Sequence, residues 1–293
     1  MNIISSETCL VGVIGDPIRH SLSPIIHNAA LQAMNLNWSY MAIPCKSKDL
    51  KLVINAMQAI DCKGLNITIP HKINSLKYCK RISSLGKEIG AINTLIPDKE
   101  GGWKGHNTDV EGFLKPLSDT QTWGQKNAIV IGCGGSAKAV ITGLKTLNLN
   151  KITIINRSQN TLDQFIDTFN FNNESLQVET YLFTNNAVKE AIKNANLIIN
   201  TTPVGMYNPK NNIDKVPLGH EVWENLKSGT TLYDLIYNPK PTEWLKIGLK
   251  KDCKIINGLE MLIQQGAASL RLWSGINEIP IDIMRKATEK YFK

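Results

Sequence analysis

Apolar runs and helically spaced apolar positions alternate along the first third of the chain. Strand-like runs cover 9–15, 38–44 and 64–70, and helical stretches cover 23–36 and 49–60. Two further apolar runs, 91–97 and 102–105, flank the polar turn 98–101. Alternation of strand and helix predicts βαβ units around a mainly parallel sheet, and the last two runs predict a hairpin.

The alternation begins again after about residue 109 and continues to 257. An apolar run at 127–131 is followed by a glycine-rich turn, a helical stretch at 137–147 and another apolar run at 151–155. This pattern predicts a second α/β sheet. We expect the polar run 170–179 to be a surface loop within it.

The C-terminal segment has a different pattern. Small or apolar residues recur at 259, 262, 263, 266, 267, 270 and 273, which form one stripe of a helix, and no strand follows. The simplest place for this helix to pack is the first domain. We therefore predict two domains, one formed by 1–108 and completed by helices in 258–293, the other formed by 109–257.

Composition narrows the function classes. The chain has 293 residues, of which 42% are hydrophobic, and its net charge of +8 is spread along its length. No apolar run approaches the ~18 residues of a membrane span, and the N-terminus does not resemble a signal peptide. Six cysteines without paired spacing are typical of a reducing, cytoplasmic compartment, and no metal-binding pattern is present. We expect a small-molecule ligand, with no nucleic acid and no membrane partner.

The segment from Gly132 to Ala137, G-C-G-G-S-A, lies between a predicted strand and a predicted helix. This is the G-x-G-x-x-A arrangement whose backbone N–H groups receive the pyrophosphate of a dinucleotide. The next strand ends at Asn156, and 156 − 132 = 24 residues is the spacing at which the adenosine ribose is met. Asn156 and Arg157 suit a 2′-phosphate better than an acidic residue would. The second domain is therefore predicted to be a Rossmann domain that binds NADP.

Ser21 and Ser23 precede Pro24 at a predicted helix start. A serine followed by proline is a common N-cap, whereas two hydroxyls beside free N–H groups could also bind a carboxylate. Ser21 has no evident capping role, so it is the stronger candidate for a ligand.

The strand 64–70 carries Asn66 and Thr68 on one face, near the end at which open α/β sheets bind ligands. Lys72 follows at the same end, either as a ligand-binding cation or as a solvated lysine. His71 could serve as a base, but no partner for it is evident, and we assign it no catalytic role.

Further along, Asn93 interrupts an apolar strand and requires a partner for its amide. Asp109 begins a predicted helix, where Thr108 and Glu111 could form a capping box that leaves it without chemistry. The loops 200–206 and 235–239 each follow an apolar strand and are expected on the rim of the cofactor site. Gln264 and Gln265 lie off the apolar stripe, and either could face a ligand or solvent.

Together these motifs resemble the shikimate dehydrogenase family over nearly the whole chain. They are S-L-S-P at 21–24, N-I-T-I-P-H-K at 66–72, G-A-I-N-T at 90–94, G-x-N-T-D at 105–109, the glycine turn, N-R-S at 156–158, N-T-T-P-x-G-M at 200–206, Y-D-L-I-Y-N-P at 233–239 and G-x-x-M-L-x-x-Q at 258–265. The resemblance implies NADPH-dependent reduction of 3-dehydroshikimate to shikimate, in aromatic amino-acid biosynthesis.

The resemblance also implies roles for individual residues. Lys72 and Asp109 would be the catalytic pair. Ser21, Ser23 and Tyr237 would hold the substrate carboxylate, and Asn66, Thr68, Asn93, Asp109 and Gln265 its ring hydroxyls. The cofactor would contact Gly132, Gly134, Gly135, Ser136, Ala137, Asn156, Arg157, Ser158, Thr201, Thr202, Leu235 and Gly258. The resemblance leaves open which of Lys72 and Asp109 accepts the proton.

The cofactor motif departs from the family pattern at one point. Many NADP-dependent relatives carry a second basic residue shortly after N-R-S/T, whereas Gln159, Asn160 and Thr161 stand here. One charged hydrogen bond is worth about 1.5–3 kcal/mol, so Arg157 alone predicts a weaker preference for NADP over NAD. The alternatives are an NAD-dependent quinate/shikimate dehydrogenase, a catalytically silent NADP-binding regulator and, from the basic charge alone, a nucleic-acid-binding protein. The sequence leaves the oligomeric state open, a homodimer included.

Overall fold

The computed structural model describes residues 4–118, 122–169, 176–207 and 215–292. The chain divides into two compact units, 1–112 with 262–293, and 113–261. The boundaries expected from the sequence, 108/109 and 257/258, lie four residues from these (112 − 108 and 261 − 257). Helices α4 (Asp109–Ser118) and α9 (Gly258–Ser274) carry the chain from one unit to the other.

The first unit is built on a mixed sheet of six strands. They are β1 (Cys9–Gly15), β2 (Trp38–Pro44), β3 (Gly64–Ile67), β4 (Arg81–Ile82), β5 (Thr94–Pro97) and β6 (Trp103–His106), in the order β2-β1-β3-β5-β6-β4. β1 runs parallel to β2 and β3, whereas β5 is antiparallel to β3 and to β6. The predicted hairpin is confirmed, because β5 and β6 pair from Thr94 with His106 to Pro97 with Trp103.

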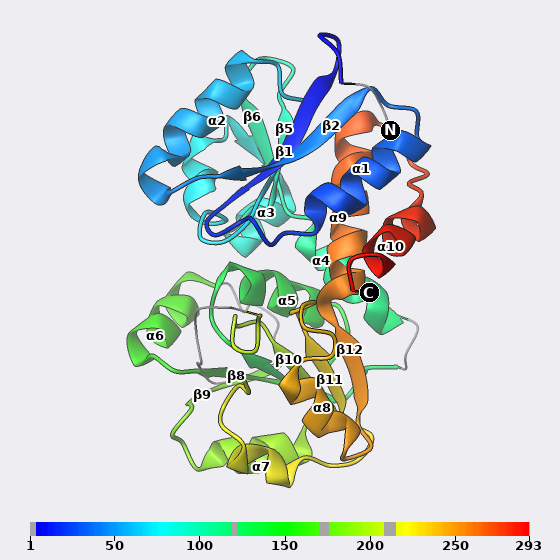
Figure 1. Ribbon diagram of the computed structural model, residues 1–293. Helices are drawn as coiled ribbons and strands as arrows, with labels where there is room; N and C mark the ends of the chain where they lie inside the picture. Colours follow the sequence, from blue (N-terminus) through cyan, green and yellow to red (C-terminus); the bar gives the residue numbers. More distant parts are fainter. Residues whose placement is uncertain (1–3, 119–121, 170–175, 208–214, 293) are drawn as a thin grey trace. The chain divides into compact units, whose positions relative to one another are not determined.

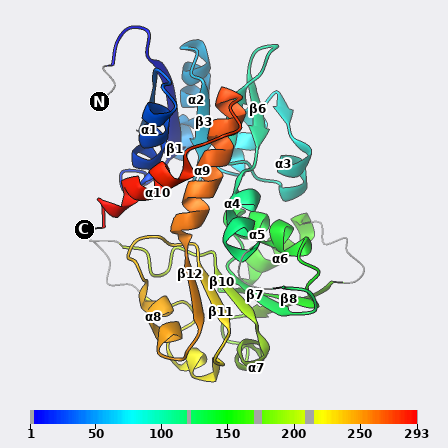
Figure 2. The ribbon, with the colours of Figure 1, turned by 90° about the vertical axis from the view of Figure 1, so that its right-hand side faces the viewer.

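Helices cover both faces of this sheet. They are α1 (Ser23–Ala33), α2 (Leu50–Ala59), α3 (Ser84–Ile89), α9 and α10 (Ile281–Glu289), with 3-10 turns η1 (Ser47–Asp49) and η2 (Asn74–Tyr78). Figure 1 shows α2 on one face and α1, α9 and α10 on the other, and Figure 2 gives the same arrangement from the side. Leu65 and Ile67 of β3 are in one core with Leu50 and Ile54 of α2. The alternate residues, Gly64 and Asn66, therefore face α9, which brings the polar position 66 to that helix.

The buried face of α9 is wider than the single apolar stripe predicted from the sequence. Gln264 and Ser269 are buried as fully as the apolar residues around them. The helix is enclosed on most of its circumference, so its polar side chains must find partners inside the protein.

The second unit contains a parallel six-stranded sheet. Its strands are β7 (Asn127–Ile131), β8 (Lys151–Asn156), β9 (Gln177–Leu182), β10 (Leu197–Asn200), β11 (Thr231–Asp234) and β12 (Lys254–Asn257), in the order β12-β11-β10-β7-β8-β9. Helices α5 (Gly135–Lys145) and α6 (Gln159–Thr168) cover one face, and α7 (Ala187–Asn194), α8 (Glu243–Leu249) and the turn η3 (Glu221–Asn225) cover the other (Figure 1). This is the doubly wound Rossmann arrangement, with its topological switch between β7 and β10.

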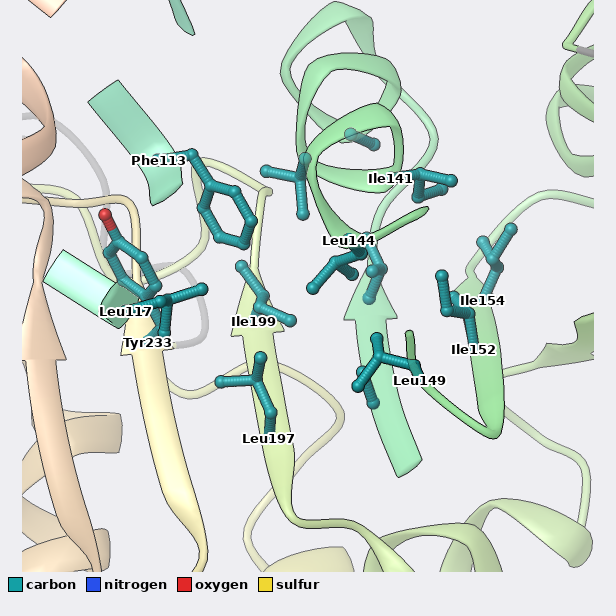
Figure 3. Close-up of a cluster of buried hydrophobic side chains, with 14 of the residues drawn as sticks. Phe113, Leu117, Ile141, Leu144, Leu149, Ile152, Ile154, Leu197, Ile199 and Tyr233 are labelled. Carbon is teal, nitrogen blue, oxygen red and sulfur yellow. The ribbon is translucent and has the colours of Figure 1, made fainter. Parts of the chain in front are cut away.

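The larger core of the second unit lies between α5 and the sheet (Figure 3). Ile141 and Leu144 of α5 pack over Ile152 and Ile154 of β8, and Leu197 and Ile199 of β10 continue the same layer. β-branched side chains on the strands and a long apolar face on α5 explain why both elements were readable from the sequence.

The polar run at 170–179 was expected to be a loop. This is wrong for 177–179, which belong to β9, and 170–175 lie outside the described residues. β9 is the edge strand of the sheet and is half-exposed along most of its length. Its polar residues are therefore compatible with pairing, and the run could not be distinguished from a loop by polarity alone.

At Gly64 the first sheet lies very close to α9. A Cβ atom there would overlap the indole of Trp273, whose Nε1 donates to the carbonyl oxygen of Leu95 at 3.0 Å. We expect Gly64→Ala to lower the free energy of unfolding in urea by about 1–3 kcal/mol, because the indole has to move. Gly124→Ala is the matched control, since its Cβ would meet only the Asn148 carbonyl oxygen at 3.9 Å. Equal stabilities of the two variants would show that this contact is not tight.

Candidate active site

An ion pair with little access to water lies in the first unit. Lys72 Nζ donates to Asp109 Oδ2 at 2.5 Å, and the two side chains are 13% and 6% exposed. Lys72 follows β3, and its carbonyl oxygen accepts from the backbone N–H of Ile92, just before β5. Asp109 is the first residue of α4. The pair therefore joins two segments that are 37 residues apart in the chain.

Asn93 binds the other oxygen of the Asp109 carboxylate. Its Nδ2 donates to Asp109 Oδ1 at 2.8 Å, and its Oδ1 accepts from the backbone N–H of Thr108 at 2.8 Å. Because the amide oxygen is held by an N–H donor, the amide nitrogen must face the carboxylate. Asn93 Nδ2 also lies 3.2 Å from Gln265 Oε1, which brings α9 to the same place.

The predicted capping box at Thr108 and Glu111 does not describe the start of α4. Asn107 Oδ1 accepts from the backbone N–H of Asp109 at 2.9 Å, the Thr108 hydroxyl bonds to Asn93, and Glu111 pairs with Arg271. The side chain of Asn107 thus caps the start of α4. Asp109 is left to hold the ammonium of Lys72.

Thr68 and Asn66, which were also predicted to bind the ring hydroxyls, lie in this unit. Their hydrogen bonding differs. The Thr68 side chain is half-buried, and its hydroxyl has no hydrogen-bond partner within the described part of the chain. Asn66 is buried and fully occupied: its Oδ1 accepts from Tyr40, and its Nδ2 reaches Ser269 Oγ at 2.9 Å and Asn93 O at 3.2 Å. Thr68 can therefore donate to a ligand, whereas Asn66 already has protein partners.

The hydrogen bonding of Ser21, just before α1, differs from the expectation. Ser21 was expected to have no capping role, and this is wrong, because its Oγ accepts from the backbone N–H of Ser23 at 3.2 Å. Ser23 is the first residue of α1 and is buried. A serine two positions before the helix can cap it as readily as one adjacent to it, and the sequence pattern does not separate these cases.

His71, for which no catalytic role was expected, is fully buried beside Lys72. Its Nε2 lies 2.7 Å from the carbonyl oxygen of Cys45, so this nitrogen carries the proton and donates. The histidine therefore fastens the segment that carries Lys72 to the end of β2.

The glycine turn of the second unit begins where β7 ends. Gly132 has a φ of 105°, and a Cβ there would lie 2.8 Å from Thr201 Oγ1, so only glycine fits. α5 begins at Gly135, two residues earlier than predicted, and no side chain caps its N-terminus at Gly134. No heavy atom lies within 4 Å of the position of a Cβ on Gly134. Free backbone N–H groups and open space fit a pyrophosphate.

The other predicted cofactor residues of this unit adjoin the same strand ends. Thr201, after β10, donates from its Oγ1 to the Ile131 carbonyl oxygen at 2.7 Å, and the Thr202 hydroxyl donates to Asn200 Oδ1 at 2.7 Å. Gly258 follows β12, and a Cβ there would overlap the carbonyl oxygen of Leu235. Ser136 and Ala137 are in the first turn of α5. Tyr237 is half-buried after β11.

Arg157 and its neighbours follow β8. The Arg157 side chain is exposed and has no ion-pair or hydrogen-bond partner among the residues that the structure describes. Asn156 Nδ2 donates to the Ser158 carbonyl oxygen at 3.0 Å, and Ser158 caps α6 by accepting from the Thr161 N–H at 3.4 Å. A guanidinium beside a helix N-terminus suits a phosphate, so these residues fit the 2′-phosphate of NADP.

Several residues that complete the site were not predicted from the sequence. Tyr40, Thr94 and Ser269 are buried beside Asn66 and Asn93 and hydrogen-bond to them. Thr94 stands within a quoted motif but was given no role. Tyr40 and Ser269 carry no local signal, because their partners lie 26 and 203 residues away.

Two other features are absent from the part of the chain that the structure describes, a cluster of metal-binding side chains and a membrane-spanning helix. Within the described ranges, no group of three or more His, Cys, Asp or Glu side chains is placed to hold a metal ion. The helices in those ranges include none that is long and apolar enough to cross a membrane.

Comparison with known proteins gives matches along the whole chain. The model of the shikimate dehydrogenase substrate binding domain matches residues 13–95, that of shikimate / quinate 5-dehydrogenase matches 117–216, and that of the shikimate 5′-dehydrogenase C-terminal domain matches 258–289. The shikimate dehydrogenase (NADP(+)) of Prochlorococcus marinus (strain MIT 9215) is 47% identical over 289 residues, which cover 99% of this chain and 100% of that protein.

Solved structures agree. A crystal structure of a shikimate dehydrogenase in complex with NADP+ matches with a TM-score of 0.86 at 34% identity, covering 99% of this chain and 98% of the other. The shikimate 5-dehydrogenase of Thermus thermophilus, in complex with NADP(H) and shikimate, matches with a TM-score of 0.80 at 29% identity, covering 96% and 99%.

Asp234, in the motif Y-D-L-I-Y-N-P, provides a pH-dependent test of this architecture. Burial raises the pKa of its carboxyl from 3.8 to about 6, against hydrogen bonds from Thr242, Ile236 and Asn200. A folded-state pKa above the unfolded one gives stability that is complete below about pH 4 and is lost as the pH rises through about 6. We expect the unfolding free energy of the wild type to fall by about 2–3 kcal/mol relative to Asp234→Asn between pH 4 and 7. Parallel curves in urea titrations would contradict this.

Proposed function

The chain belongs to the shikimate dehydrogenase family, and on that premise we propose that it catalyses the reversible reduction of 3-dehydroshikimate to shikimate with NADPH, in aromatic amino-acid biosynthesis. The observation that carries the proposal is the Lys72–Asp109 pair, which lies among buried amides and hydroxyls of the first unit. The same chain carries a glycine turn and an unpartnered Arg157 in the described part of the second unit. We propose that the first unit binds the substrate and the second binds NADP.

The polar groups of the first unit match the chemistry of a hydroxylated ring acid. We propose that the ring hydroxyls bind to Thr68, Asn93, Asp109 and Gln265. Hydrogen bonds connect Asn93 with Asp109 and Gln265 at the ion pair, and the Thr68 hydroxyl has no partner among the described residues. The substrate carboxylate is assigned to the helix start at Ser21 and Ser23. Tyr237, to which the family resemblance gives the same role, belongs to the second unit. Asn66, whose amide is already used within the protein, is treated below.

Ketone reduction requires a positive charge near the ketone oxygen and a proton for it, and Lys72 can supply both. When bound, NADPH provides the hydride. Negative charge then develops on the ketone oxygen, and the Lys72 ammonium can stabilise this charge and donate a proton to it. In the opposite direction, the neutral Lys72 amine that this donation leaves takes the proton back from the hydroxyl. Asp109, held by Asn93 and Lys72, keeps the ammonium directed at one point.

NADP as cofactor is supported by the fit of the second unit. The glycine turn offers backbone N–H groups for the pyrophosphate, and Arg157 offers a guanidinium for the 2′-phosphate. A cytoplasmic location is proposed as well, since all six cysteines are free thiols, as in a reducing compartment. Light scattering would measure the oligomeric state, for which the sequence leaves a homodimer open.

One observation favours a broader-specificity alternative. Ser158 to Thr161 supply no second cation beside Arg157. A quinate/shikimate dehydrogenase that also accepts NAD would need no such cation, and this is the second candidate function.

The direct test is an absorbance assay of reduced nicotinamide. The wild type is incubated with shikimate or quinate, each with NADP or NAD. We expect rapid reduction with shikimate and NADP, and a preference over NAD of roughly 10- to 150-fold, the contribution of one charged hydrogen bond. Comparable rates with NAD or quinate would select the alternative, and no reduction with any combination would select the silent regulator. Arg157→Ala is the control, because it should lower the rate with NADP at limiting cofactor and leave the rate with NAD unchanged.

Lys72→Ala tests the catalytic assignment. We expect kcat to fall by about 10²- to 10⁴-fold, because the proton donor is removed. Binding of shikimate and NADP, measured by calorimetry, should stay within a few-fold, because other groups hold both molecules. Lys51→Ala, at an exposed position of α2, is the matched control. Near-normal turnover of Lys72→Ala would exclude Lys72 as the proton donor.

A further inference from the structure

Tyr40 is buried in the first unit at a distance from the ion pair, yet hydrogen bonds connect the two. The tyrosine lies on β2 and is 2% exposed. Its ring stacks on that of His27, with centroids 4.0 Å apart. Its hydroxyl donates to Asn66 Oδ1 at 2.8 Å and also has Ser23 as a hydrogen-bonding partner. Neither the motifs nor the family resemblance assigned this residue a role.

The bond from Tyr40 determines how Asn66 is oriented. Since the phenolic O–H donates to the amide oxygen, the amide nitrogen must point away, toward Ser269 and Thr94. Its Nδ2 lies 2.9 Å from Ser269 Oγ and 3.3 Å from Thr94 Oγ1. The Ser269 hydroxyl donates to the Gln265 carbonyl oxygen at 3.1 Å and lies 3.0 Å from Thr94 Oγ1. The Ser269 branch therefore ends at the Gln265 carbonyl oxygen, and the direct bond from Asn66 Nδ2 is the one that reaches Thr94.

Thr94 passes the same direction on to the ion pair. Its hydroxyl donates to Asn93 Oδ1 at 2.9 Å, and Asn93 Nδ2 donates to Asp109 Oδ1 at 2.8 Å. The donors in the series Tyr40, Asn66, Thr94 and Asn93 thus all point toward the carboxylate. Hydrogen bonds aligned in this way polarise one another, and each reinforces the next.

We propose that Tyr40 is a positioning residue for catalysis, which acts through Asn66, Thr94 and Asn93 to hold the Asp109 carboxylate facing Lys72. This inference rests on the proposed function. It assigns Asn66 to the same series, because its amide hydrogens and its oxygen are used within the protein. A flipped Asn93 amide would direct its oxygen at the carboxylate. The Thr108 N–H and the Thr94 hydroxyl at the end of the series both oppose this by donating to Asn93 Oδ1.

The first experiment compares kcat and KM for Tyr40→Phe and the wild type. The variant keeps the ring on His27 and loses only the hydroxyl. We expect kcat for shikimate oxidation to fall about 3- to 10-fold, the effect of one buried hydrogen bond, with KM for NADP unchanged. Tyr233→Phe is the matched control, because it removes a buried hydroxyl that has no hydrogen-bond partner within the described residues. Its kcat should equal that of the wild type.

Thr94 separates hydrogen bonding from packing. Thr94→Val keeps the shape and loses the hydroxyl, whereas Thr94→Ser keeps the hydroxyl. We expect Thr94→Val to lower kcat and Thr94→Ser to retain it. In the double variant Tyr40→Phe with Thr94→Val, kcat should fall no further than in Thr94→Val alone, because both changes interrupt one series.

The outcomes are distinct. Unchanged kcat in Tyr40→Phe, or effects of Tyr40→Phe and Thr94→Val that multiply, would overturn the role of Tyr40 while leaving the proposed function intact. A wild type inactive on shikimate would remove the proposed function and this role with it. Equal thermal unfolding of Tyr40→Phe and Tyr233→Phe, measured in parallel, would show that a lower kcat does not come from unfolding.

Discussion

A lysine ammonium and an aspartate carboxylate lie together in the first unit with little access to water. The buried amides and hydroxyls around them are needed to satisfy the hydrogen bonding of these two charges. Taking two such charges out of water costs several kcal/mol each unless they are paired and their remaining donors and acceptors are satisfied. Lys72 and Asp109 meet the first condition. Asn93 and Asn107 meet the second, one at the carboxylate and the other at the backbone N–H of Asp109. The amide of Asn93, directly before β5, is thus required by the neighbouring charge.

The same requirement extends outward through the unit. Asn93 needs donors for its oxygen, which Thr94 and Thr108 provide, and Thr94 is in turn approached by Ser269 on α9. Each buried polar group brings another into the interior, and the series ends at Tyr40, where an aromatic ring and a single hydroxyl can meet an apolar environment. α9 can be enclosed on most sides only because its polar residues take part in this network.

Much of this could be predicted from the sequence, and the limits have a physical cause. The strands β1, β2 and β7 lie where their apolar runs predicted, and the glycine turn was evident because backbone geometry there allows no other residue. Lys72, Asn93 and Asp109 stood in motifs. Tyr40 and Ser269 could not be found, since their partners are distant in the chain and a buried tyrosine or serine resembles ordinary core. Ser21 and β9 were misjudged because capping and edge pairing depend on neighbours that a local pattern does not contain.

On the proposed assignment of the site residues, the two units use different means of recognition, and this affects how specificity is distributed. In the second unit, main-chain N–H groups at Gly134 and Gly135 would receive the pyrophosphate, which NAD and NADP share. Discrimination at the 2′ position therefore depends on side chains after β8, where Arg157 is the cation. In the first unit, by contrast, recognition is distributed over hydrogen-bonded side chains that fix one another. Cofactor preference can thus change through one residue, whereas a change of substrate must preserve a network that also keeps a buried charge pair in place.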